Sequence, residues 1–320
     1  MVLPVATRAM QHTLPAERTT QIRHVLIVVL VLNVLVAGAK LGYGWYSGSV
    51  AMSADGVQSL LDGFANVIGL IGIAIASRPP DRDHHYGHER YETLASLAIA
   101  VLMTIGVVEI VESAIVRWRT GEQPEVTTMS FVVLLVTMAI NGGVSIWERA
   151  QARKWSSDLL AADARHTASD VLVSLTVIGG LIGELIGLEG ADSAVSLLVA
   201  ATIAWAAWGI IRDASRVLTD ASTTDPVVLM RAVLTSDGVV TAHNLRARTS
   251  GGRTWVDVHV TVDPEMSVRD AHDVATGVEG SLRSAVGSDT QVIVHVEPAE
   301  PPHTRPDALV AIDVYDERLV

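Results

Sequence analysis

Six long apolar stretches, separated by short polar segments, fill the first two thirds of the chain. They lie near residues 24–46, 50–77, 92–116, 129–147, 158–187 and 192–211. Each is long enough to cross about 30 Å of hydrocarbon as an α-helix. The pattern therefore predicts an α-helical membrane domain of six transmembrane helices over residues 22–214, preceded by a polar cytosolic tail over residues 1–21.

The last third of the chain has a different pattern, beginning at a composition shift near residues 219–225. It predicts the order helix, strand, strand, helix, strand, over Pro226–Leu234, Val239–Thr249, Thr254–Val262, Val268–Val286 and Gln291–Glu297. A Gly251-Gly252 pair between the first two strands is typical of a hairpin turn. The order αββαβ predicts a cytosolic α+β domain of ferredoxin-like type over residues 215–298. Residues 299–320, rich in proline and acids, are expected to form a flexible tail.

Composition narrows the class of protein. A mean hydropathy of +0.38 and 49% hydrophobic residues are typical of integral membrane proteins. The net charge of −12 argues against a nucleic-acid partner and fits a protein that handles cations. The chain has no cysteine, so a metal site must use imidazole, carboxylate or amide ligands. No G-x4-G-K-[ST] segment occurs, which argues against a nucleotide-driven pump.

Basic residues gather on one side of the predicted membrane domain. They lie before the first stretch and around the second and fourth connections, at Arg8, Arg18, Arg23, Arg78, Arg82, Arg90, Arg149, Arg153 and Lys154. The opposite connections hold only Arg117 and Arg119. By the positive-inside rule both termini are expected in the cytosol, which agrees with an even number of crossings.

Two of the apolar stretches carry matching polar stripes. The stripes are Asp55, Gln58 and Asp62, and Asp163, His166 and Asp170. Spacings of three and four residues place each stripe on one narrow helix face. An acid near the bilayer centre costs about 2.5–3.5 kcal/mol, so four of them require a compensating function. Two such helices facing each other would gather carboxylates, an imidazole and an amide into a divalent-cation site.

These two motifs resemble those of the cation diffusion facilitators, and the resemblance extends over most of residues 20–298. It implies a homodimeric antiporter that exchanges a divalent metal for protons, with a cytosolic domain that dimerises and senses metal. The central ligands it implies are Gln58, Asp62, His166 and Asp170, while Asp55 and Asp163 would support them or pack the helices. Gln58 stands where the family usually has Asp or His. Zn²⁺ is the expected ion, with Fe²⁺ or Mn²⁺ as alternatives, because an amide oxygen is a harder ligand than imidazole.

The resemblance implies two further metal sites. One lies in the loop after the second stretch, at Asp81, His84 and His88, with His85 and Asp83 as substitutes. Arg90 and Glu92, just after it, resemble residues that tie this loop to neighbouring helices or to the dimer partner. The other site lies in the cytosolic domain, at His243, His259, His272, His295 and Glu297. Glu297 stands where Asp is more usual. Solvated surface histidines are the alternative interpretation of both groups.

Divalent metal ions are thus expected as substrate and regulator, with no other cofactor. Lys40, Asn33 and Asn141 are further polar residues in the apolar stretches, and they either line a pathway or only bond neighbouring helices. A non-transporting membrane metal sensor or scaffold with a degenerate central site is the main alternative function. An intramembrane metalloenzyme is a weaker one, because no H-E-x-x-H occurs. Short loops indicate a bacterial-type, multi-pass protein of the inner membrane.

Overall fold

The computed structural model describes residues 16–47, 50–120, 128–185, 191–250 and 253–303 of the 320-residue chain. The chain divides into two compact units, Met1–Ser215 and Arg216–Val320. Each unit has its own hydrophobic core, one built from long helices and the other from a small sheet with two helices.

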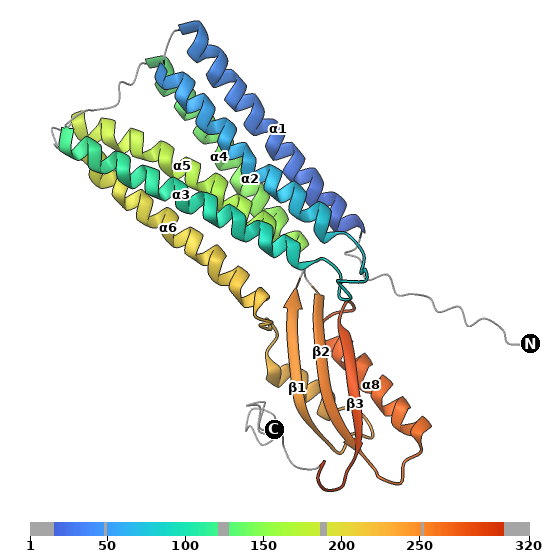
Figure 1. The fold of residues 1–320 in the computed structure, drawn as a ribbon. Coiled ribbons are helices and arrows are strands. Elements are labelled where there is room, and N and C mark those ends of the chain that lie inside the picture. Colours follow the sequence, from blue (N-terminus) through green and yellow to red (C-terminus); the bar gives the residue numbers. More distant parts are fainter. Residues whose placement is uncertain (1–15, 48–49, 121–127, 186–190, 251–252, 304–320) are drawn as a thin grey trace, which may run out of the picture. The chain divides into compact units, whose positions relative to one another are not determined.

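Long helices make up the first unit (Figure 1). They are α1 (Ala16–Ser47), α2 (Val50–Ala76), α3 (Arg90–Thr120), α4 (Thr128–Trp155), α5 (Asp158–Leu185) and α6 (Ala191–Leu218). Each coincides with one of the six apolar stretches. α5 packs against α2, α3 and α4, and α1 packs against α2 and α4. The two helices that carry the predicted polar stripes, α2 and α5, are therefore neighbours.

Small residues allow α2 to approach its neighbours closely. A Cβ atom added at Gly56 would lie 2.7 Å from Cγ of Leu41 on α1, closer than real contacts. A Cβ atom added at Gly72 would overlap Cβ of Ala95 on α3. Because dispersion and hydrogen bonds hold membrane helices together, close backbone approach strengthens both contacts. Glycine on α2 thus fixes the helix that carries Asp62 against α1 and α3.

Four helical segments are long and apolar enough to cross a membrane among the described residues. They are Glu17–Tyr43, Arg90–Thr120, Phe131–Trp155 and Ser193–Leu218. On α2 a shorter apolar segment, Asp62–Ala76, was found. α5 carries Asp158, Asp163, Arg165 and Asp170 within half its length, which lowers its apolar character. Among the described residues, α2 and α5, the two helices with the polar stripes, therefore lack an apolar segment of full membrane-spanning length. Six crossings stay a prediction.

A buried ion pair joins helix ends at one side of the first unit. The Arg18 guanidinium of α1 donates to both carboxylate oxygens of Glu92 on α3, at 2.9 and 3.2 Å. It also donates to the carbonyl oxygens of Trp155 and Ser156, at 2.8 and 3.0 Å. The Ser157 hydroxyl donates to Glu92 as well. One arginine therefore connects α1, α3 and the turn between α4 and α5.

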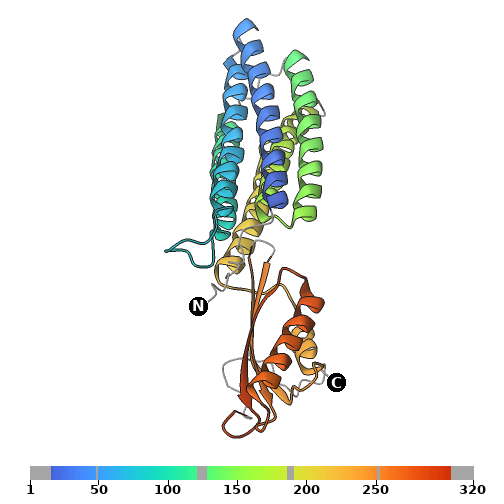
Figure 2. The same ribbon diagram turned by 90° about the vertical axis from the view of Figure 1, so that its right-hand side faces the viewer.

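The second unit contains a three-stranded sheet with two helices on one face. Its elements are α7 (Pro226–Leu234), β1 (Thr241–Ser250), β2 (Arg253–Val262), α8 (Val268–Val286) and β3 (Gln291–Pro298). The strand order is β1-β2-β3, with β1 antiparallel and β3 parallel to β2. All bounds lie within two residues of those expected. Figure 2 shows α8 alongside the sheet, and Val278 and Leu282 of α8 share a core with Val258 of β2.

A β-bulge interrupts β1 between His243 and Arg246. Asn244 there has a φ of +52°, a conformation that asparagine adopts more readily than most residues. The extra residue changes the alternation, so that Ala242 and Leu245 both face the core. His243 lies on the opposite face, directly across from His259 of β2. Bulges commonly redirect side chains in this way beside functional sites.

The Arg18–Glu92 pair generates a first prediction, on stability. Arg18→Met leaves the buried Glu92 carboxylate without its cation, and breaking a buried ion pair in this way costs about 3–5 kcal/mol. We expect a clearly lower thermal unfolding temperature for the detergent-purified variant. Arg23→Met is the matched control, since Arg23 lies on the same helix but is exposed. Equal unfolding temperatures for the two variants would contradict the assigned role of Arg18.

Candidate metal centres

The first cluster of metal-ligating side chains joins α2 to α5. Asp62 comes from α2, and His166 and Asp170 lie one turn apart on α5. Each offers one donor atom, and these atoms all lie within 4.8 Å of one another. All three side chains are partly buried. The structure therefore brings together three of the four ligands that the sequence predicts.

The His166 imidazole of this cluster lacks a hydrogen-bond partner among the described residues. Both ring nitrogens are buried, and neither has a hydrogen-bond partner among the residues that the structure describes. Buried polar atoms are almost always paired, and an unpaired one requires an explanation. A metal ion between His166 and the two carboxylates would supply the partner. The side chains of Asp55 and Gln58 lie outside the described residues, so their ligand roles stay predictions.

Asp163, expected to support the ligands, bonds away from the cluster. It is fully buried, and its Oδ2 accepts a hydrogen bond of 2.6 Å from the Asn66 amide of α2. Asn66 in turn accepts a bond of 2.8 Å from Asn33 of α1. On its other side, Asp163 contacts the buried carboxyl group of Glu148 on α4. This network holds α5 against α2 and α4 one turn from His166, and it joins α2 in turn to α1.

Sequence reasoning did not identify Asn66 or Glu148. Asn66 lies four residues after Asp62, and Glu148, which is completely buried, lies four residues before Ala152. Thr167, next to His166, donates a hydrogen bond of 3.1 Å to Glu148. A polar residue within an apolar stretch is the signal that reveals such groups, but only the structure shows which of them meet.

The second cluster lies in the loop between α2 and α3. Asp81 Oδ1 lies 3.1 Å from His84 Nδ1, and Asp81 Oδ2 lies 3.3 Å from His88 Nε2. The two imidazole rings are 4.3 Å apart between centroids. Ligand atoms of a tetrahedral Zn²⁺ ion lie about 3.3 Å from one another, so these separations fit one ion. His85 and Asp83, the expected substitutes, are exposed and outside this cluster.

Backbone hydrogen bonds hold the Asp81 carboxylate in this position. Its Oδ1 accepts hydrogen bonds from the backbone N–H groups of His84 and Asp83, at 2.8 and 2.9 Å. These two bonds, the one from His84 first, lower the pKa of Asp81 from 3.8 to about 2. Because the pKa is lower in the folded protein, the stabilisation from these bonds is fully present above the usual pKa of 3.8. It is lost as the pH falls toward 2, where the carboxylate becomes protonated. The carboxylate is therefore ionised and ready to bind a cation at any physiological pH.

The third cluster lies on the face of the sheet opposite the helices. Glu297 of β3 is its centre: His259 Nδ1 lies 3.0 Å from Oε1, and His243 Nε2 lies 3.2 Å from Oε2. His295 Nε2, more exposed, lies 3.4 Å from Oε1. The register places the three histidines side by side across the strands. These spacings again fit the ligand atoms of one metal ion.

The structure adds one residue to this cluster and does not bring another to it. His303 lies after β3, and its Nδ1 is 3.6 Å from Glu297 Oε2, although the sequence suggests no role for it. His272, predicted as a ligand, is exposed on α8. It lies outside the cluster because α8 covers the opposite face of the sheet.

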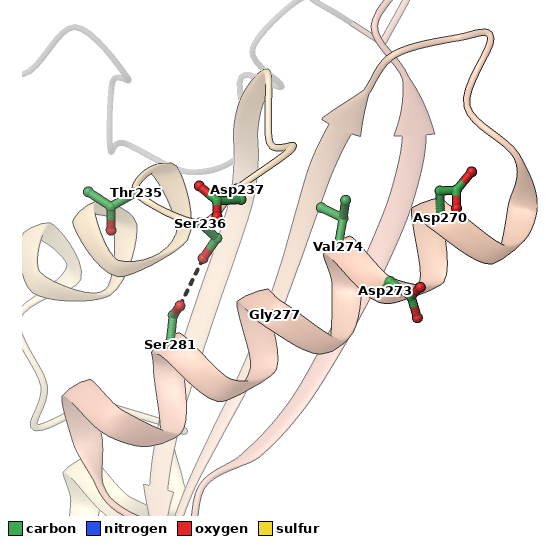
Figure 3. Close-up of a pocket in the computed structure, with 8 residues that line it drawn as sticks. All are labelled: Thr235, Ser236, Asp237, Asp270, Asp273, Val274, Gly277 and Ser281. Carbon is green, nitrogen blue, oxygen red and sulfur yellow. Dashed lines mark hydrogen bonds between the residues drawn. The ribbon is translucent and has the colours of Figure 1, made fainter.

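A pocket of about 500 Å³ lies on the helical side of the same unit, away from these histidines (Figure 3). It is lined by Thr235, Ser236, Asp237, Asp270, Asp273, Val274, Gly277 and Ser281. A hydrogen bond of 3.0 Å between the hydroxyls of Ser236 and Ser281 closes one end. Asp270 is already bonded to Ser267 at the start of α8. No residue of the three clusters lines this pocket.

Comparisons with known proteins give matches along most of the chain. Residues 26–219 match the cation efflux transmembrane domain, and residues 227–299 match the cation efflux protein, cytoplasmic domain. An uncharacterized transporter of Methanocaldococcus jannaschii is 31% identical over 85% of this chain and 96% of its own. The manganese efflux system protein MneP of Bacillus subtilis is 28% identical over 88% and 98%. The cation-efflux pump FieF of Cronobacter sakazakii is 28% identical over 86% and 92%.

The loop cluster generates a prediction for metal binding. Asp81→Asn removes the ionised carboxylate between the two imidazoles, so we expect at least about a tenfold loss of Zn²⁺ affinity at this site. Asp83→Asn, a neighbouring exposed acid outside the cluster, should leave the affinity unchanged. Calorimetry on full-length protein in which Asp170→Asn and Glu297→Gln silence the other clusters measures this site alone. Equal affinities of the two variants would exclude Asp81 as a ligand.

The sheet cluster generates a parallel prediction. Glu297→Gln removes the one carboxylate that contacts all four histidines, so Zn²⁺ binding at this site should be lost in calorimetry. His303→Ala should weaken binding by a smaller factor, because three histidines and Glu297 remain. The measurement uses full-length protein with Asp81→Asn and Asp170→Asn. Glu300→Gln, an exposed acid of the same segment, is the control, and an equal loss there would refute the assignment.

Proposed function

The chain belongs to the cation efflux family, and we propose that it exchanges a divalent metal ion for protons across the membrane. Membership makes it an integral membrane transporter of cation efflux type with a cytoplasmic domain. The observation that carries the proposal is the cluster of Asp62, His166 and Asp170, whose donor atoms lie within 4.8 Å of one another. The unpaired His166 nitrogens support a metal ion as the missing partner.

The chemistry of this cluster supports coupling between metal and protons. Two carboxylates balance the charge of a divalent cation, and the imidazole binds it as the neutral base. All three groups bind metal only when deprotonated, so protons and metal compete for the same atoms. If the cluster opens alternately to the two sides of the membrane, metal released on one side is replaced by protons. That cycle is antiport.

We also propose the arrangement that the positive-inside rule indicates. In it all six helices cross the membrane, both termini are cytosolic, and the cytosolic domain is ferredoxin-like. Residues 227–299 match the cytoplasmic domain of cation efflux proteins, and this match supports a cytosolic location for β1–β3. The protein would act as a homodimer, with metal at the loop and sheet clusters as regulator. Their donor spacings of 3.0–3.6 Å support metal binding at both.

The transported ion is proposed from the donor set and the relatives. Oxygen donors dominate the central cluster, with His166 as its one nitrogen donor and Gln58 as an expected amide ligand. Carboxylate and amide oxygens suit Mn²⁺, whereas additional imidazole favours Zn²⁺. MneP of Bacillus subtilis, a relative of this chain, is named as a manganese efflux protein, which supports Mn²⁺ as a candidate in addition to the Zn²⁺ that the sequence favours. We therefore propose Mn²⁺ and Zn²⁺ as substrates, with Fe²⁺ as a further candidate.

Transport by purified protein in liposomes tests this function. With an imposed pH gradient, the wild type should move Mn²⁺ or Zn²⁺ against the proton flux, and Asp170→Ala should abolish that movement. Asp213→Ala is the control, because Asp213 is an exposed acid on α6 outside the cluster. A folded Asp170→Ala protein that transports at the wild-type rate would refute the central site. A wild type that binds metal without any flux would instead favour the sensor or scaffold.

A further inference from the structure

Lys40 is a buried cation that the proposed exchange does not explain. The chain has only two lysines, and Lys40 lies within the apolar segment Glu17–Tyr43 of α1. Its side chain is 8% exposed. Lysines near the ends of membrane helices usually extend toward the interface, where water solvates the ammonium group. Lys40 is instead turned into the helix bundle.

The ammonium group of Lys40 is directed to the helix that carries Asp62. Nζ donates a hydrogen bond of 2.8 Å to Oγ of Ser59 on α2. Ser59 lies three residues before Asp62, so the two side chains share one helix face. The ammonium group also interacts electrostatically with the Asp170 carboxylate of α5. Lys40 is thus within electrostatic range of the central cluster from a third helix.

Charges at the centre of the bundle explain why this cation is tolerated. Asp62 and Asp170 contribute two carboxylates, and the Asp163–Glu148 contact adds further acidic groups nearby, with Asp163 one turn before His166 on α5. His166 is the neighbouring imidazole. Two buried carboxylates without a counter-ion repel each other strongly, and a fixed ammonium group nearby offsets part of their negative charge. A divalent ion entering the same cluster meets that ammonium as a like charge.

We propose that Lys40 is a tethered counter-cation of the central site, which balances its carboxylates when no metal is bound and lowers the affinity for every divalent ion. This role rests on the proposed function of the Asp62–His166–Asp170 cluster. Lys40 is a positioning residue rather than a ligand, since an ammonium group has no lone pair for a metal. Its effect is a repulsion that aids metal release and so keeps exchange reversible.

Because the effect comes from charge, it must act equally on all divalent ions. Lys40→Met removes the charge and keeps a chain of similar length. We expect this variant to bind Mn²⁺, Zn²⁺ and Cd²⁺ at the central site at least about tenfold more tightly than wild type, without changing their order. In liposomes it should show a lower KM and a lower kcat, since tighter binding slows release. A change of ligand such as Gln58→His should instead change the order of the ions.

Three variants separate charge from packing. Lys40→Arg keeps the cation and should retain affinity within about threefold of wild type. Ser59→Ala removes the hydrogen bond but not the charge, so its affinity should not rise as it does in Lys40→Met. Lys154→Met is the control, because the exposed Lys154 lies over the Trp155 ring at the end of α4. Calorimetry on full-length protein with Asp81→Asn and Glu297→Gln restricts the measurement to the central site.

The outcomes distinguish this inference from the proposed function. If Asp170→Asn abolishes binding in the same assay and Lys40→Met binds no more tightly than wild type, the counter-cation role is wrong and the central site stands. Weaker binding in both Lys40→Met and Ser59→Ala would show that Lys40 only joins α1 to α2, which also refutes the inference. If Asp170→Asn retains full affinity, the central site itself is wrong, and the role of Lys40 fails with it.

Discussion

The first unit depends on one constraint: a polar group inside an apolar helix bundle must find a partner there. An unpaired charge or donor in a dry interior costs several kcal/mol, so each buried polar side chain determines which helices touch. Arg18 joins α1 to α3 through Glu92, Lys40 joins α1 to α2 through Ser59, and Asp163 joins α5 to α2 through Asn66. Among the described residues, several buried polar atoms have no hydrogen-bond partner, and both ring nitrogens of His166 belong to this group, at the place where metal binding is proposed.

The loop cluster and the Arg18–Glu92 pair belong to one continuous segment. His88 lies two residues before α3, and the backbone N–H of Tyr91 donates to its carbonyl oxygen at 3.0 Å. Glu92 follows in the same turn and binds Arg18. A metal ion that draws Asp81 and His88 together would therefore act on the first turn of α3. That turn is attached to α1 and to the connection between α4 and α5, where the ligand-bearing helix begins.

The second unit gathers its ligands by a different physical means. Its helices cover one face of the sheet, and the other face carries imidazoles at matched register positions on β1, β2 and β3. Glu297 contributes a carboxylate to all of them, and His303 reaches it from beyond the last strand. Without cysteine, imidazole and carboxylate are the strongest metal ligands this chain has, and all three clusters use both.

The sequence by itself determined the elements and the ligand candidates. The length of the six apolar stretches predicted the six long helices. Alternating apolar residues and the Gly-Gly turn predicted the αββαβ order. Spacing on one helix turn placed His166 beside Asp170, and a short loop kept Asp81 near His88. The tertiary structure decided what depends on contacts between elements. It directed Asp163 to Asn66 and Glu148, Lys40 to Ser59, and His303 to Glu297, pairings that no local pattern encodes. It also excluded His272 from the sheet cluster, because the helix that carries it packs on the other face, and a bulge at Asn244 turned His243 toward His259.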